Sequence, residues 1–187
     1  MRLPATAVLL AAATVCLSGV AHAQQVRLST SMGDIVLELE SQKAPRTAAN
    51  FLQYVKDRHY DGTVFHRVID GFMIQGGGMT PTLESKPTRA PIALEARSGL
   101  RNLKYTVAMA RTSAPDSATA QFFINVADNA FLDADRARDG HGYAVFARVV
   151  AGAEVVDRIK SVPTGRSGPY SDVPTTPVQI IKATVEK

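Results

Sequence analysis

The chain has 187 residues, a formal net charge of +4 at pH 7 and a single cysteine, Cys16. The charge is modest and basic residues do not alternate with aromatic ones, so the composition argues against a nucleic-acid-binding protein. One cysteine cannot form an internal disulfide, and a chain of this length can build a single hydrophobic core.

The first 23 residues have the pattern of a cleavable secretory signal peptide. Arg2 is followed by an apolar stretch over residues 3–20 and by the small-x-small ending Ala21-His22-Ala23. A membrane anchor is the alternative, but Pro4 and an internal Ser-Gly pair make the stretch marginal for a span of about 20 residues. We therefore expect an exported mature domain over residues 24–187, without cysteine and without a membrane anchor.

The mature chain begins with patterns typical of a β-hairpin and a helix. Residues 26–30 and 35–40 alternate apolar and polar side chains on either side of a break, which predicts a hairpin with one buried face. Pro45 then occupies a first helical position, and apolar residues follow at helical spacing until Asp61-Gly62. We predict one amphipathic helix over residues 45–58.

The rest of the chain predicts short strands separated by long loops. The expected strands cover residues 63–68, 72–75, 105–110, 121–126, 143–149 and 178–185, the last pairing with the first hairpin. A second helix is expected at residues 153–159, and the proline-rich residues 161–177 are expected to form an irregular surface loop. Many short strands, two helices and no internal repeat indicate one mainly β domain, closed as an antiparallel barrel.

Residues 65–78 are the most informative stretch, because they combine a cation, aromatic rings, a thioether and an amide and end in three consecutive glycines. In an extended segment Phe65 and Arg67 would share one face, while His66 would lie on the other, behind the site. An arginine beside apolar side chains and the neutral side-chain amide of Gln75 suits the binding and polarisation of an uncharged amide bond in a substrate. This combination points to a bond next to proline.

A second group of candidate residues follows at Gln121-Phe122-Phe123-Ile124-Asn125 and Phe131-Leu132-Asp133. In a strand Gln121 and Phe123 share a face and present an amide and a ring. On periodicity alone, the alternative that all these aromatic residues belong to the core is equally strong.

The sequence has no motif typical of a metal site, a nucleophilic serine or a nucleotide-binding loop. His59, His66 and His141 are widely spaced, so no metal site is expected. The hydroxyl residues of the loop at residues 111–120 lack the motif around a nucleophilic serine. The three glycines at residues 76–78 do not have the spacing of a nucleotide loop, and they indicate a tight bend or a close backbone approach.

Together these segments resemble the cyclophilin family of peptidyl-prolyl cis-trans isomerases, in particular its exported bacterial members. The resemblance extends from about Val26 to the C-terminus and implies an eight-stranded antiparallel barrel capped by two α-helices. The motifs that carry it are Gly33-Asp34-Ile35, Ala44-Pro45-Arg46-Thr47-Ala48-Ala49-Asn50-Phe51, residues 65–78, Met109-Ala110-Arg111, Gln121-Phe122-Phe123-Ile124, Phe131-Leu132-Asp133 and Tyr143-Ala144-Val145-Phe146.

The resemblance also implies a role for each site residue. Arg67 would be the catalytic arginine, with Gln75 and Gln121 supporting it and the peptide backbone. Ala110 and Arg111 would form the edge along which the peptide lies. The proline pocket would be built from Phe72, Met73, Phe123 and Leu132.

Three positions depart from the commonest family pattern. Arg111 stands where many members have Asn, and since the family uses main-chain groups there, we expect altered sequence preference more than altered catalysis. Phe131 replaces a frequent Trp at the binding site, so only weak cyclosporin binding is expected. Tyr143 takes the place of a frequent His in the pocket wall.

The expected protein is therefore a monomeric periplasmic isomerase that needs no cofactor or metal. It would act on Xaa-Pro bonds in proline-containing segments of unfolded or folding exported proteins. One alternative is a non-catalytic chaperone that holds such segments in the same groove. Another is a barrel that carries a small ligand, against which the large apolar inward residues argue.

Overall fold

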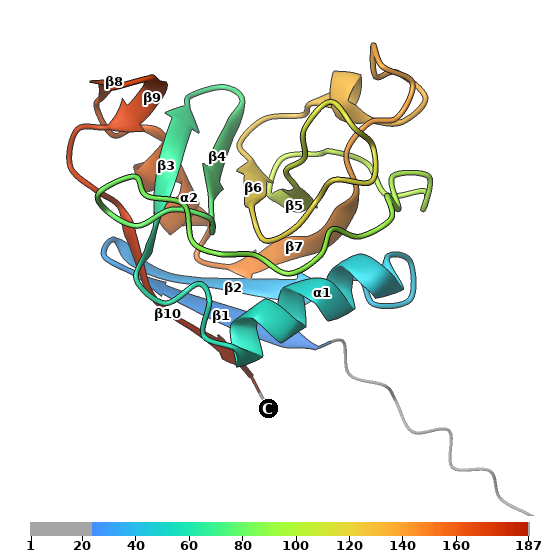
Figure 1. The fold of residues 1–187 in the computed structure, drawn as a ribbon, viewed down its shortest axis with the longest axis horizontal. Coiled ribbons are helices and arrows are strands. Elements are labelled where there is room, and N and C mark those ends of the chain that lie inside the picture. Colours follow the sequence, from blue (N-terminus) through green and yellow to red (C-terminus); the bar gives the residue numbers. More distant parts are fainter. Residues whose placement is uncertain (1–23, 187) are drawn as a thin grey trace, which may run out of the picture.

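The computed structural model describes residues 24–186 (Figure 1). The predicted signal peptide, residues 1–23, lies outside the described residues. Within the described part, no helix is both long and apolar enough to cross a membrane.

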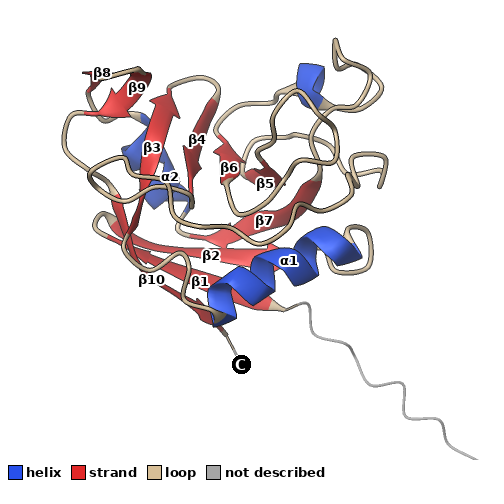
Figure 2. Cartoon of the chain, viewed as in Figure 1, coloured by secondary structure: helices blue, strands red, loops and turns tan. Residues whose placement is uncertain are grey.

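The structure is mainly β (Figures 1 and 2), and its described residues form two α-helices and one short 3-10 helix. The elements are β1 Gln25–Thr30, β2 Gly33–Leu39, α1 Pro45–Lys56, β3 Thr63–Ile69, β4 Met73–Gly76, β5 Thr106–Met109, β6 Phe122–Asn125, η1 Ala130–Leu132, β7 Val145–Ala151, α2 Ala153–Lys160, β8 Thr164–Ser167, β9 Tyr170–Pro174 and β10 Gln179–Val185.

Eight of the strands close into a barrel in the order β1-β10-β3-β4-β6-β5-β7-β2. Every neighbouring pair is antiparallel, and β10 pairs with β1, as predicted for the last strand. The expected closed eight-stranded barrel with two helices is confirmed.

The barrel interior is filled with side chains. Phe51 of α1 is fully buried, and its ring centroid lies 5.0 Å from that of Tyr60, 5.6 Å from that of Phe122 and 5.0 Å from that of Phe146. Offset and edge-on aromatic contacts of this kind add to the burial of their apolar area. A helix residue therefore packs against strand residues in one core, and the space that a carried ligand would need is occupied.

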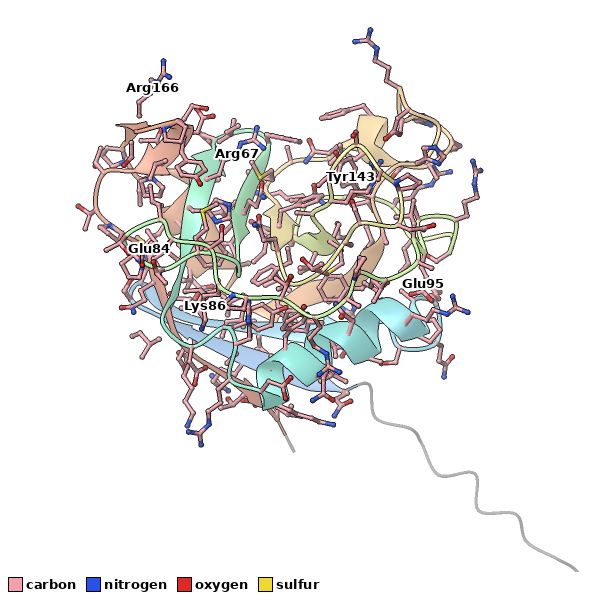
Figure 3. All side chains as sticks on the ribbon, in the orientation of Figure 1. Arg67, Glu84, Lys86, Glu95, Tyr143 and Arg166 are labelled. Carbon is pink, nitrogen blue, oxygen red and sulfur yellow. The ribbon has the colours of Figure 1, made fainter. Side chains whose placement is uncertain are left out.

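Residues of the long loop between β4 and β5 hold both ends of α1. The Glu95 carboxylate accepts hydrogen bonds from the Thr47 amide, at 2.8 Å, and the Thr47 hydroxyl, at 2.7 Å, so it caps a helix that has no side-chain cap of its own. Lys86 donates to the carbonyls of His59 and Asp61 just beyond the helix (Figure 3). Glu95 and Lys86 therefore attach this loop to the start of α1 and to the residues that follow its end.

The expectation of an irregular loop at residues 161–177 is wrong. Strands β8 and β9 pair antiparallel as a separate two-stranded sheet. Pro169 lies in the turn, and Pro174 is the last residue of β9, paired with Thr164 at the end of the ladder, so neither proline interrupts the strands. The first helix also ends two residues earlier than predicted, because Arg58 has a positive φ of 54°.

Candidate active site

The site is a cleft of about 190 Å³ on the outside of the barrel. Nine of the eleven residues that the sequence nominated line it, namely Arg67, Phe72, Met73, Gln75, Ala110, Arg111, Phe123, Leu132 and Tyr143. The other two lie at its edge, where Gln121 accepts a hydrogen bond from Gln75 and the Phe131 ring stacks on that of Phe72 at 5.7 Å. Figure 3 shows Arg67 and Tyr143 on the same side of the molecule.

Arg67 reaches the cleft because strand β3 contains a bulge. Phe65 pairs with Gly76 and Arg67 with Gln75, so His66 is an extra residue without a partner on β4. The bulge separates Phe65, which is buried in the core, from Arg67, which lines the cleft. The prediction that these two residues share a face is therefore wrong, because strict alternation stops at His66.

The Arg67 guanidinium is available to a bound molecule. Within residues 24–186, no hydrogen bond or ion pair engages its side chain. Gln75 does not hold it as expected, since the Gln75 Nε2 instead donates to the Gln121 Oε1 at 2.9 Å. The cleft thus presents a cation with uncommitted N–H groups beside a pair of joined amides.

An apolar pocket adjoins the guanidinium. Met73, Phe123 and Leu132 are 2%, 5% and 8% exposed, and they pack with Ala108 and Val145 in a cluster separate from the barrel core. Cross-strand neighbours build it, since Gln75 pairs with Phe123 and Phe123 with Ala108. The alternative that all these aromatic residues are core therefore fails for Phe123, which turns to the cleft, and holds for Phe122.

The glycine run allows a close backbone approach beside the cleft. A Cβ at Gly78 would lie 2.4 Å from the Gln121 Cγ, and one at Gly77, where φ is +83°, would lie 2.8 Å from the Phe122 ring. Any side chain there would displace Gln121 or Phe122. This bears out the interpretation of the run as a close approach.

Arg111 differs from Arg67, because each of its three guanidinium nitrogens has a hydrogen-bond partner. Its side chain is only 1% exposed, with Nε donating to the Gly142 carbonyl and Nη1 to the Thr112 carbonyl, each at 2.9 Å. Nη2 is bonded to the Asp139 carboxylate. The guanidinium carbon lies 4.6 Å from the centroid of the Tyr143 ring, within cation–π range.

Asp139 was not found from the sequence. Besides Arg111, its carboxylate accepts hydrogen bonds from the amides of His141, at 2.9 Å, and Gly142, at 3.1 Å. The Arg111 guanidinium and these amides hold the pKa of the Asp139 carboxyl well below its usual range. The Asp-Gly pair was a visible turn signal, but nothing in the sequence linked it to Arg111.

Two histidines, His59 and His66, are buried. Burial lowers the pKa of His59, whose Nε2 lies 3.2 Å from the Gly77 carbonyl oxygen, and burial lowers the pKa of His66 to about 4. Across residues 24–186, no group of three or more His, Cys, Asp or Glu side chains is arranged to hold a metal ion.

Comparisons with known proteins agree on one family. The family model described as "Cyclophilin type peptidyl-prolyl cis-trans isomerase/CLD" matches residues 25–185. The peptidyl-prolyl cis-trans isomerase cyp18 of Streptomyces antibioticus is 60% identical over 161 residues, which cover 86% of this chain and 97% of that protein. Peptidyl-prolyl cis-trans isomerase B of Escherichia coli K12 is 54% identical over 163 residues, covering 87% and 99%.

A solved structure shows the same fold. The cyclophilin-type peptidyl-prolyl cis-trans isomerase of Cryptosporidium parvum, crystallised in the presence of the dipeptide Ala-Pro, superposes with a TM-score of 0.75 at 26% identity. The match covers 88% of this chain and 99% of that one.

Proposed function

Because the chain belongs to the cyclophilin-type peptidyl-prolyl cis-trans isomerase family, we propose that Arg67 catalyses rotation about Xaa-Pro bonds while the adjoining pocket holds the proline ring. The supporting observation is the contrast between two arginines in one cleft. Arg67 has no partner among the described residues, whereas Arg111 is bonded through Nε, Nη1 and Nη2.

The reaction requires a torsion and no bond to another atom. Amide resonance gives rotation a barrier of about 18–20 kcal/mol, and an unaided Xaa-Pro bond takes tens to hundreds of seconds. In the twisted state resonance is lost and the prolyl nitrogen gains a lone pair. An N–H of Arg67 directed at that nitrogen interacts with the twisted state more than with the planar one, which is the differential binding that catalysis needs.

The remaining stabilisation comes from the rest of the cleft. One preorganised donor contributes about 3–4 kcal/mol, whereas a 10⁵-fold acceleration requires about 7 kcal/mol. The pocket of Met73, Phe123 and Leu132 fixes the proline ring while the preceding carbonyl swings. The joined amides of Gln75 and Gln121 supply donors near that carbonyl's path.

Arg67 variants test the catalytic role. In the cis-to-trans relaxation of a short Ala-Pro peptide at low temperature, Arg67→Ala should lower kcat/KM by about 10²–10³-fold. Arg67→Lys should lose most of the activity, because an ammonium lacks the planar fork. Peptide binding should change little in both. Full turnover by Arg67→Ala would rule out this mechanism, and binding without turnover by the native chain would favour a non-catalytic holder.

We also propose that the enzyme works in the periplasm on exported proteins. The signal-peptide pattern of residues 1–23 supports export, and the open cleft suits proline segments of chains that have not finished folding. The mature domain would act as a monomer and bind cyclosporin weakly because of Phe131. Expression of the full chain in a Gram-negative host, followed by fractionation and N-terminal sequencing, should yield a periplasmic protein beginning at Gln24. A membrane-bound or uncleaved product would contradict this.

A further inference from the structure

A second cavity, of about 420 Å³, lies outside the isomerase cleft. Its walls are residues 64–66 of β3, residues 81–83, residues 165–167 on β8 and residues 173–175 at the end of β9. We call it the hairpin cavity, because β8 and β9 close one side of it. Its volume is about twice that of the cleft, at 420 Å³ against 190 Å³, and the mechanism above does not use it.

His66 brings an unsatisfied ring to this cavity. The residue is 6% exposed, and its Nδ1 is buried without a hydrogen-bond partner in the described part of the chain. The ring's backbone hydrogen-bond partner is Val64, on the same strand, so Nδ1 is the ring atom left without one. Each nitrogen of a neutral imidazole is either a donor or an acceptor, and leaving one unpaired in the interior costs stability. A bound polar group would satisfy this ring.

The charge of the cavity is positive. Arg166 is its only charged residue other than histidine, and within residues 24–186 the Arg166 side chain makes no ion pair. Ser167 beside it contributes a hydroxyl with no hydrogen bond to the described residues. No Asp or Glu lines the walls, and Leu83 is held there at a positive φ of 62°, a strained conformation of the kind found at binding sites.

Consecutive residues of the chain line the hairpin cavity and the isomerase cleft. His66 lines the cavity and Arg67, the next residue, lines the cleft. A peptide that places its proline beside Arg67 continues at about 3.3 Å per residue, so a side chain about two to four residues away reaches the far side of His66. Figure 3 shows Arg67 and Arg166 on the same upper side of the molecule.

We propose that the hairpin cavity binds an acidic side chain of the substrate polypeptide, a few residues from the proline being isomerised. The carboxylate pairs with Arg166 and accepts hydrogen bonds from the His66 ring and the Ser167 hydroxyl. The cavity makes the enzyme prefer prolines with a nearby Glu or Asp. This inference rests on the proposed function, because the proline must lie beside Arg67.

Matched peptides test the preference. Each contains one Ala-Pro bond and either Glu or Gln at one position, two to four residues before or after the proline. For the native enzyme at low ionic strength, kcat/KM should favour Glu over Gln by about two- to fivefold at one or more positions, and added salt should reduce the difference.

Two charge-reversal variants separate the cavity from general electrostatics. Arg166→Glu should abolish or reverse the preference, whereas Lys182→Glu, an equal change on exposed β10 outside the cavity, should leave it intact. Both variants should turn over a short Ala-Pro peptide normally. In a long-range ¹H–¹⁵N spectrum, the His66 ring signals should shift with the Glu peptide more than with the Gln peptide.

The outcomes distinguish the two proposals. Equal rates with Glu and Gln at every position, or a preference that survives Arg166→Glu, would overturn the cavity assignment. Failure of the native enzyme on the short Ala-Pro peptide would instead count against the proposed function, since that peptide does not reach the cavity.

Discussion

The Arg111 guanidinium carbon lies 4.6 Å from the centroid of the Tyr143 ring, and the Tyr143 amide donates to the Leu132 carbonyl at 2.9 Å. One buried cation thus braces two walls of the apolar pocket, Tyr143 by direct contact and Leu132 through Tyr143. Since the Arg111 side chain is 1% exposed and each of its three guanidinium nitrogens is bonded, we expect it to position the pocket walls rather than to contact a substrate.

The contact between Arg111 and Tyr143 should be measurable as a coupling free energy. In a double-mutant cycle with Arg111→Gln and Tyr143→Leu, we expect a coupling of about 1–2 kcal/mol in the free energy of unfolding by urea, because the cation–π contact is desolvated. Additive losses would show that the two side chains are independent. The same cycle on kcat/KM reports whether the brace also shapes the pocket.

Asp139→Asn should loosen this brace from outside the cleft. The amide keeps the shape of the side chain but removes the negative charge that Arg111 faces. We expect KM for an Ala-Pro peptide to rise while kcat changes less, because the pocket wall moves and Arg67 does not. Asp139→Glu should restore part of the affinity. A fall in kcat at constant KM would mean that Asp139 acts on the reaction itself.

The Asp139 carboxyl should also keep the brace intact in mild acid. Its pKa lies below the usual range in the folded state, so the stability it contributes is present above the unfolded pKa of about 4 and is lost as pH falls through the lower folded value. KM of the native enzyme should therefore be insensitive to this group from pH 8 to 5. Asp139→Asn should show its higher KM throughout that range.

His66 should make the protein less stable in weak acid. Its pKa is about 4 in the folded state against about 6.5 when unfolded, so the unfolded chain binds more protons between these values. Stability is complete above pH 6.5 and falls by about 3 kcal/mol as pH drops to 4. Urea unfolding at several pH values should show that His66→Gln removes this part of the slope. An unchanged slope would mean that His66 titrates normally.

Gly142 and Gly140 form a matched pair for testing backbone constraint. Both have positive φ, +68° and +71°, but a Cβ at Gly142 would lie 2.6 Å from the Leu132 carbonyl oxygen, whereas one at Gly140 meets nothing within 4 Å. Gly140→Ala should cost about 1 kcal/mol of unfolding free energy. Gly142→Ala should cost about 3 kcal/mol or more and raise KM, since Leu132 lines the pocket. Equal effects would show that only φ matters.

The eight barrel strands and both helices could be predicted because alternation and helical spacing are local properties of the sequence. The roles of Arg67 and the pocket residues came from a resemblance of several motifs in one order, which spacing alone would not have supplied. By contrast, the bulge at His66 depends on the register of β3 against β4, and register is a property of two strands together.

Contacts between loops that lie far apart in the sequence could not be predicted for a related reason. Arg111 and Asp139 are 28 residues apart, and neither lies in a regular element that would fix their separation. The hairpin of β8 and β9 was missed because the number of prolines was taken as a sign of irregularity. Their positions, in the turn and at or beyond the strand ends, leave the interior of both strands free of proline.

The place of β10 between β1 and β3 has a consequence for the order of assembly. The ring of strands cannot close until the last seven-residue strand, Gln179–Val185, is inserted between partners that were synthesised long before it. Until then β1 and β3 each have an open edge, and their pairings with β10 are the ones that wait for this strand. A polypeptide crossing a membrane N-terminus first could thus close its barrel only after β10 had reached the far side.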